Sequence, residues 1–177
     1  MSIRWFRRAT ATLGMVVIAS LAHAQDALVS IGFDEPELSE LAAGAVINTQ
    51  FARPDQVPGV YEHAWRTDGF SSWASIPVRL DGSDGFTVAA WVALESFPSD
   101  LEVPVERLSP SSVFQQHDGA RGFDLFIDTY GRWGLEIGTS RGNVRVDAPD
   151  RFPLRRWVHV AAAVDGKSAT VYLDGEA

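Results

Sequence analysis

Gly122 to Gly175 read GFDLFIDTYGRWGLEIGTSRGNVRVDAPDRFPLRRWVHVAAAVDGKSATVYLDG, and this stretch decides the fold class. Short runs in which apolar and polar residues alternate are separated by YGR, SRGN, APDRFP and VDGK. Each separator carries Gly, Pro, Asp or Asn, residue types that favour the backbone angles of a chain reversal. Consecutive strands joined by such turns are typical of an antiparallel β-sandwich or barrel. We therefore predict strands at 113–116, 123–128, 133–138, 144–148, 157–164 and 169–173.

The clearest strand of the preceding half lies at 86–94, because apolar residues occupy both of its alternating faces. One face takes Phe86, Val88, Ala90, Val92 and Leu94, and the other takes Thr87, Ala89, Trp91 and Ala93. A strand of this kind belongs in the middle of a sheet that is covered on both sides. Shorter strands are expected at 26–33, 46–51, 61–66 and 73–78. The Pro-containing stretches 34–45, 54–59 and 96–110 are expected to be loops, because proline cannot donate to a sheet ladder.

The amino terminus has the three regions of an export signal. Arg4, Arg7 and Arg8 supply the positive charge, an apolar run follows at 11–22, and Ala22-His23-Ala24 is a cleavage site with small residues at its first and third positions. The apolar run is shorter than the roughly 20 residues that a membrane-spanning helix needs. Residues 1–24 are therefore predicted to be a bacterial signal peptide, and the mature chain is predicted to be periplasmic or secreted, with no membrane span.

Charge and cysteine content exclude several classes of function. The chain has 15 basic and 23 acidic residues. The expected leader holds three of the basic residues and no acid, which leaves 12 against 23 and a net charge of −11. Nucleic acid and anionic membranes both need a basic face, so neither is expected as a partner. The absence of cysteine excludes disulfides and thiolate chemistry. The remaining residues, about 150, suffice for one domain with its own hydrophobic core.

Three groups of motifs resemble the laminin G-like, concanavalin A-like jelly-roll domains. They are GFTVAAWV at 85–92, RWVHVA with VDG and VYLDGE between 156 and 176, and a passage containing Trp65, Asp68, Gly69, Trp73, Ile76 and Pro77. The resemblance covers roughly residues 60–176 and implies an all-β, two-sheet antiparallel jelly-roll sandwich over 25–177. Related domains continue beyond the last motif with a closing strand. The resemblance therefore implies that the domain is truncated at its carboxyl end, and the strand at 26–33 is expected to have an open edge.

No catalytic constellation is evident. Asp124 and Asp128 share a strand face, but four residues of strand place them roughly 13 Å apart, which is too far for the paired carboxylates of a glycosidase. The sequence has no Gly-x-Ser-x-Gly elbow. The histidines at 63, 117 and 159 do not have a metal-binding spacing. These observations favour a non-catalytic module, although the full-length protein can still be an enzyme.

Carbohydrate binding is the function that the polar and aromatic residues favour. Sugar sites in β-sandwiches combine an aromatic platform with planar polar side chains. The candidates are Trp73, Gln116, His117, Asp118, Arg121, Tyr130 and Trp133. For Trp133 a place in the core is the competing interpretation. The expected partner is a polysaccharide or glycan.

Calcium is the cofactor that the resemblance implies, because many related domains carry this ion. Calcium prefers carboxylate and carbonyl oxygens from loops. Asp34, Asp68 and Asp165 are the candidate ligands. Asp68 and Asp165 also belong to Asp-Gly pairs, which are common in tight turns, so a purely structural role stays open.

A further resemblance suggests the context of the domain. VFQQHD at 113–118, GFDL at 122–125 and RWGL at 132–135 are similar to laminin G-like modules placed ahead of family 32 glycoside hydrolases. The predicted function is an exported, non-catalytic carbohydrate-recognition module that works beside a carboxyl-terminal catalytic domain. The alternatives are a fragment of a glycoside hydrolase with its own activity and a protein-binding adhesion domain.

Overall fold

The computed structural model describes residues 15–18, 29–33, 46–48, 55–67, 72–80, 85–100, 110–118 and 121–177. The carboxyl-terminal half forms a four-stranded sheet with the order β11-β10-β9-β8. Its strands are β8 (Ser111–Asp118), β9 (Arg121–Ile127), β10 (Trp133–Thr139) and β11 (Gly142–Asp147). Each strand follows its neighbour along the chain and pairs with it antiparallel. This sheet is therefore a simple meander, as the spacing of the turn residues predicted.

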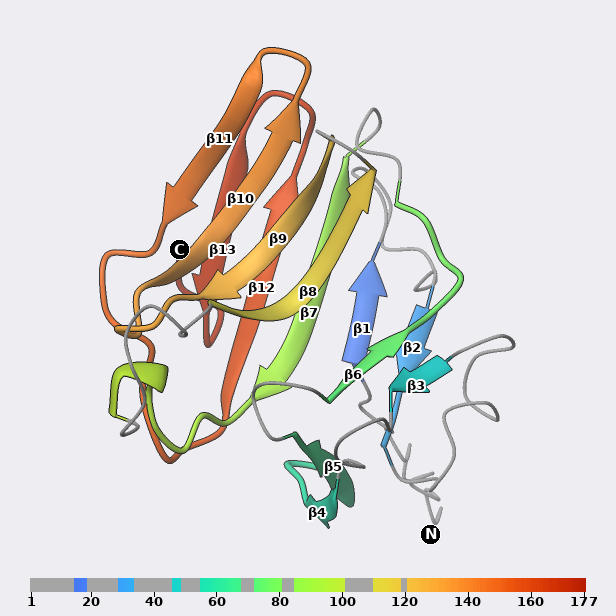
Figure 1. The fold of residues 1–177 in the computed structure, drawn as a ribbon, viewed down its shortest axis with the longest axis vertical. Coiled ribbons are helices and arrows are strands. Elements are labelled where there is room, and N and C mark those ends of the chain that lie inside the picture. The colour runs from blue at the N-terminus through green and yellow to red at the C-terminus, as the bar shows by residue number, and fades with distance from the viewer. Residues whose placement is uncertain are drawn as a thin grey trace, which may run out of the picture.

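A five-stranded sheet with the order β13-β12-β7-β1-β2 lies behind the first sheet (Figure 1). Its strands are β13 (Ala169–Leu173), β12 (Val158–Val164), β7 (Phe86–Val92), β1 (Met15–Ile18) and β2 (Val29–Ile31). All its pairings are antiparallel. Two small two-stranded sheets join β3 (Val46–Asn48) to β6 (Trp73–Ser75) and β4 (Asp55–Pro58) to β5 (His63–Arg66). A 3-10 turn, η2, spans Pro98–Asp100.

The hydrophobic core fills the space between the two large sheets. Its buried side chains come from alternate positions of β7 and β12 on one side and of β9 and β10 on the other. Phe86 of β7 meets Phe123 of β9 with 4.6 Å between the ring centroids. Leu135 and Val158 are completely buried. Burial of such side chains is the main stabilising contribution to a domain without disulfides.

The structure confirms the predicted all-β sandwich and most of the predicted strands. Strand β13 matches its predicted range, and β7, β9, β10, β11 and β12 differ from theirs by one or two residues at an end. The alternation predicted for 86–94 is also confirmed, since Phe86, Val88 and Ala90 lie in the core. Among the described residues no helix is long and apolar enough to cross a membrane.

Two strands lie where none was predicted. The expected loop at 54–59 contains β4, which pairs with β5 alone and ends at Pro58. An edge position of this kind tolerates a proline that a central strand would not. Strand β1 lies inside the expected leader and pairs with β2. Strand β1 gives β2 a neighbour on one side, and among the described residues β2 is still the last strand of its sheet.

Candidate functional site

The outward face of the four-stranded sheet carries a regular array of polar side chains. We use the term outward face for the residues of β8–β11 that alternate with the core residues. In the strand register Gln115 pairs with Asp124, Asp124 with Glu136, and Glu136 with Arg145. These four residues therefore form one row across all four strands. His117 and Asn143 belong to a second row, joined through Gly122 and Gly138.

Hydrogen bonds fix several of these side chains in place. Ser112 Oγ donates to Asp124 Oδ2 at 3.1 Å, and Asn143 Nδ2 donates to Glu136 Oε1 at 2.7 Å. The Arg145 guanidinium lies 4.2 Å above the centroid of the Phe126 ring. This cation–π contact covers an aromatic side chain that would otherwise face outward. The outward face therefore presents oriented polar groups over a hydrophobic base.

Asp124 and Glu136 stand directly opposite each other on neighbouring strands. Cross-strand partners have Cβ atoms about 4.5–5.5 Å apart, and like charges at such positions repel. Burial raises the pKa of Asp124, and Glu136 raises it further, against the lowering effects of the Ser112 hydrogen bond and of His117. Asp124 Oδ1 is buried and has no hydrogen-bond partner among the described residues. Burial and the facing Glu136 carboxylate therefore both disfavour the charged form of Asp124.

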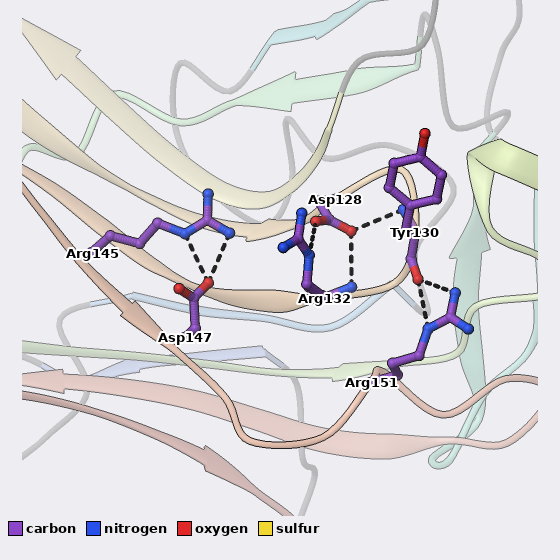
Figure 2. Close-up of polar contacts among 6 residues, drawn as sticks. All are labelled: Asp128, Tyr130, Arg132, Arg145, Asp147 and Arg151. Carbon is purple, nitrogen blue, oxygen red and sulfur yellow. Dashed lines mark hydrogen bonds and ion pairs between the residues drawn. The ribbon is translucent and has the colours of Figure 1, made fainter. Parts of the chain in front are cut away.

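The turn between β9 and β10 is organised by the Asp128 carboxylate (Figure 2). Its Oδ1 accepts the backbone N–H groups of Tyr130 and Arg132, each at 2.9 Å. Its Oδ2 pairs with Arg132 Nε at 2.7 Å. Burial by itself would raise the pKa of Asp128, but the two backbone N–H groups and the guanidinium together lower it. We call Asp128–Arg132 the Tyr130 turn.

A second arginine holds this turn from the segment that follows β11. Arg151 donates from Nε to the Tyr130 carbonyl oxygen at 2.7 Å and also from its Nη2 group. Its guanidinium lies 4.6 Å above the Phe97 ring centroid. The Tyr130 backbone is thus fixed on both sides, while its side chain remains 49 % exposed. Figure 2 shows the Tyr130 ring pointing away from the ion pairs.

Replacing Asp128 is expected to weaken this turn in a pH-dependent way. Asp128→Asn keeps an acceptor oxygen but loses the charge, so we expect a loss of about 1–2 kcal/mol of unfolding free energy at pH 7. Because the pKa of Asp128 is lowered by folding, its stabilisation is complete above the unfolded value of 3.8 and disappears as pH falls through the folded value. Urea unfolding at pH 7 and pH 3 measures the difference between the two proteins, which must shrink at pH 3. The matched control is Asp150→Asn, an exposed neighbour for which we expect less than about 0.5 kcal/mol at either pH.

The structure separates the predicted carbohydrate-binding residues into different regions. Asp118 pairs with Arg121, and His117 with Gly122, at the β8–β9 hairpin. Tyr130 lies at the other end of β9, roughly 25 Å of strand away. Trp73 belongs to β6, which Figure 1 shows on the opposite side of the view from the β9–β10 turn. His117, Arg121, Trp73 and Tyr130 are all exposed, but no single small-ligand site holds them together.

Two of the predicted carbohydrate-binding residues, Trp133 and Gln116, face the core, so their assignment to a sugar site is corrected. Trp133 is only 3 % exposed and packs edge-on against Phe152, so it cannot serve as a sugar platform. Gln116 donates to the Leu80 carbonyl oxygen at 2.9 Å, and its Oε1 accepts the Leu80 N–H at 2.8 Å. The Gln116 amide therefore satisfies the backbone N–H and C=O of Leu80, as a neighbouring strand would. Its donor and acceptor atoms are used in this structural contact.

Of the three predicted calcium ligands the structure describes only Asp165, because Asp34 and Asp68 lie outside the described residues. Asp165 Oδ1 accepts the N–H groups of Lys167 and Ser168, and Oδ2 accepts the Ser168 hydroxyl. The two backbone hydrogen bonds lower the pKa of Asp165. These contacts are those of a hairpin-turn residue. No group of three or more metal-binding side chains occurs among the described residues, so calcium remains a prediction.

Sequence reasoning missed the residues that complete the outward face. Asp124 was considered only with Asp128 on its own strand, whereas its neighbour in space is Glu136 on β10. The turn centred on Tyr130 and Gly131 could have revealed this pairing, because a hairpin register follows from the position of its turn. Arg151 offered no comparable signal, since it reaches Tyr130 across 21 residues of chain.

Two antiparallel sheets that enclose one core, with a polar outward face and an exposed aromatic turn, define a lectin-like β-sandwich. The family model described as the concanavalin A-like lectin/glucanases superfamily matches residues 68–177, more than half of the chain. The chain therefore belongs to this superfamily. Neither a curated protein nor a solved structure matches it.

Proposed function

We propose that this domain binds carbohydrate and that a sugar ring stacks on Tyr130. The observation that carries the proposal is the exposed Tyr130 ring on a turn whose backbone is fixed by Asp128 and Arg151. A turn whose backbone is already fixed loses little conformational freedom when its side chain binds a ligand. The aromatic face supplies apolar contact to the ring carbons of a sugar, and its phenol can hydrogen-bond to a hydroxyl group.

The surroundings of Tyr130 supply the polar groups that a sugar needs. Arg132 is fixed by Nε on Asp128, while its side chain remains 68 % exposed. Arg145 and Asp147 form an ion pair on the neighbouring strand β11, and Figure 2 shows them beside the turn. Arg145 belongs to the row that also contains Asp124 and Glu136. An extended polysaccharide along the outward face would meet donors and acceptors at successive positions.

The proposed setting is outside the cytoplasm, as a recognition module of a larger secreted glycoside hydrolase. Membership of a superfamily that is described by lectins and glucanases supports the carbohydrate class. The leader expected at 1–24 supports export. A module of this kind would hold a catalytic domain near its polymer and raise the effective substrate concentration.

Hydrolysis by the domain itself is the second candidate function, and the opposed carboxylates favour it. Retaining glycosidases hold two carboxyl groups about 5 Å apart, and the Cβ atoms of directly opposite residues such as Asp124 and Glu136 are usually about as close, so their carboxyl groups can come within that range. Release of reducing sugar by the isolated chain, lost in Glu136→Gln, would establish this function. Binding without release of sugar would leave the recognition function in place.

Tyr130→Ala is expected to weaken polysaccharide binding about tenfold, which corresponds to about 1.4 kcal/mol. Affinity electrophoresis through gels containing inulin, levan, xylan or β-glucan identifies the polymer that retards the wild-type chain, and titration calorimetry then measures the loss. Tyr61→Ala is the matched control, because Tyr61 is also an exposed tyrosine but belongs to the β4–β5 region. Tyr130→Phe should keep most of the affinity. Equal losses in the Tyr61 and Tyr130 variants would contradict the assignment.

A further inference from the structure

Phe126 is a buried aromatic residue that lies outside the core of the sandwich. The core takes Phe123, Leu125 and Ile127 from β9, so Phe126, which alternates with them, belongs to the outward face. It is nevertheless only 4 % exposed. An aromatic ring on this face must be covered by other side chains, and the strength of that cover decides whether a ligand can reach the ring.

The cover that the described residues supply is the side chain of Arg145. Its guanidinium lies 4.2 Å from the centroid of the Phe126 ring, although β10 separates the two strands that carry them. The residue between them is Gly134, which is in register with Phe126 on one side and with Asp147 on the other, and it has no side chain to block the arginine. On the β8 side Phe126 is in register with Ser112. Small residues therefore flank Phe126 on both neighbouring strands, and a long arginine lies over its ring.

Arg145 is held over the ring by weak interactions. Its Nε and Nη2 atoms both contact Asp147 Oδ1 at 2.7 Å (Figure 2). The two side chains are 41 % and 52 % exposed, and ion pairs with this exposure contribute little. Cation–π contacts at exposed sites are also weak. A ligand that makes more contact with the ring than the guanidinium does can therefore displace the arginine.

We propose that Phe126 is a second stacking platform for a sugar ring, covered by Arg145 in the free protein and uncovered when polysaccharide binds. This inference rests on the proposed function and adds to it a binding residue and a class of ligand. The apolar face of a sugar ring makes the contact with the phenyl ring. Because Phe126 and Tyr130 are only four residues apart, one extended polymer can contact both rings.

The polar residues around Phe126 favour an uncharged polysaccharide. Ser112 and Asp124, which are joined by a hydrogen bond, lie beside the ring and offer groups to sugar hydroxyls. Asp124 also faces the Glu136 carboxylate on β10. Two acids at the border of the platform would repel a sugar that carries a carboxylate or sulfate group, and such like-charge contacts exclude the wrong ligand.

The test measures ring exposure and affinity in the full chain. Arg145→Ala removes the cover, and Phe126→Leu keeps an apolar side chain but removes the aromatic face. Arg141→Ala is the matched control, because Arg141 is an exposed arginine in the turn before β11. Labelling with para-fluorophenylalanine gives each phenylalanine a fluorine NMR signal, and the signal that is lost in Phe126→Leu belongs to Phe126. The change of that signal between light and heavy water reports the exposure of the ring.

Affinity is measured by titration calorimetry with whichever of inulin, levan, xylan and β-glucan retards the wild-type chain in gels, and with polygalacturonate as the anionic comparison. We expect Arg145→Ala to expose Phe126 and to raise affinity for the uncharged polymer about fivefold, because a minor binding-competent state becomes the main one. Arg145→Ala/Phe126→Leu should lose this gain, and Arg141→Ala should change neither quantity. In the wild type, saturation with polymer should shift the Phe126 signal, and this shift decides the question if the double variant does not fold.

A Phe126 ring that stays covered in Arg145→Ala overturns the inference, as does a gain in affinity that persists without the aromatic ring. Tighter binding of polygalacturonate than of every uncharged polymer overturns the class of ligand. Binding that is lost in Tyr130→Ala but is the same in wild type and Arg145→Ala overturns this inference and leaves the proposed function in place. If no polymer binds either the wild type or Arg145→Ala, the proposed function is overturned as well.

Discussion

Trp133→Ala is expected to lower the free energy of unfolding by about 3–5 kcal/mol, the usual cost of truncating a buried tryptophan. Trp133 is 3 % exposed, and its ring meets Phe152 edge-on with 6.0 Å between the centroids. Phe152 is itself among the largest fully buried side chains. Because domains of this size are stable by only about 5–15 kcal/mol, the variant should be unfolded at much lower urea concentrations. Urea unfolding followed by far-ultraviolet circular dichroism measures this loss without relying on tryptophan fluorescence.

Two control variants distinguish the effect of lost core packing from the effect of removing any indole ring. Trp73→Ala removes a tryptophan that is 53 % exposed, so its expected cost is below about 0.5 kcal/mol. Trp133→Phe keeps an aromatic ring in the core and removes an indole N–H that has no partner among the described residues, so it should cost less than about 1.5 kcal/mol. A cost for Trp73→Ala that equals that of Trp133→Ala would contradict the assignment of Trp133 to the core.

The contrast between Trp133 and Tyr130 shows what the local sequence can predict. Trp133, Leu135 and Ile137 alternate with two glycines and Glu136 in WGLEIG, so period-two reasoning places the tryptophan with the apolar residues in the core. The structure confirms that these alternating apolar residues face the core. The exposure of Tyr130 also follows from its position in a turn, where the strand alternation stops. The prediction of an aromatic sugar-binding platform was therefore wrong for Trp133, which follows the strand periodicity. It stays open for Tyr130, which lies in the turn.

Features that depend on distant pairing were beyond the sequence pattern. Gln116 looks like a free polar residue in VFQQHD, and only the fold brings its amide to Leu80, 36 residues away. Strand β1 pairs with β7 across about 70 residues, and no local periodicity encodes that choice of partner. The same limit applies to Arg151 beneath Tyr130. Hairpins and core faces were predictable because their contacts are local, whereas the contacts that complete the sheet and the Tyr130 turn are not.

Gly122→Ala is expected to cost about 3–5 kcal/mol, because it combines backbone strain with displacement of a neighbouring strand. Gly122 has a φ of +136°, a conformation that residues with a side chain rarely adopt. A Cβ atom at this position would also lie 1.8 Å from the Gln116 carbonyl oxygen. The β8 backbone would have to move away from β9 near its hairpin, where His117 and Arg121 lie.

Gly142→Ala is the control variant, because it introduces backbone strain without displacing a neighbouring strand. Gly142, the first residue of β11, also has a positive φ, of +116°, but a Cβ atom there meets nothing within 4 Å. We expect it to cost about 1–2 kcal/mol, the strain contribution alone. Urea unfolding gives the loss of unfolding free energy for both variants. Hydrogen exchange of the Leu80 amide shows whether β8 has moved. That amide donates to Gln116 Oε1, so its protection should fall in Gly122→Ala and persist in Gly142→Ala. Equal free-energy losses with an unchanged Leu80 amide would mean that β8 absorbs the new methyl group without moving, and that close packing of the two strands does not require glycine at position 122.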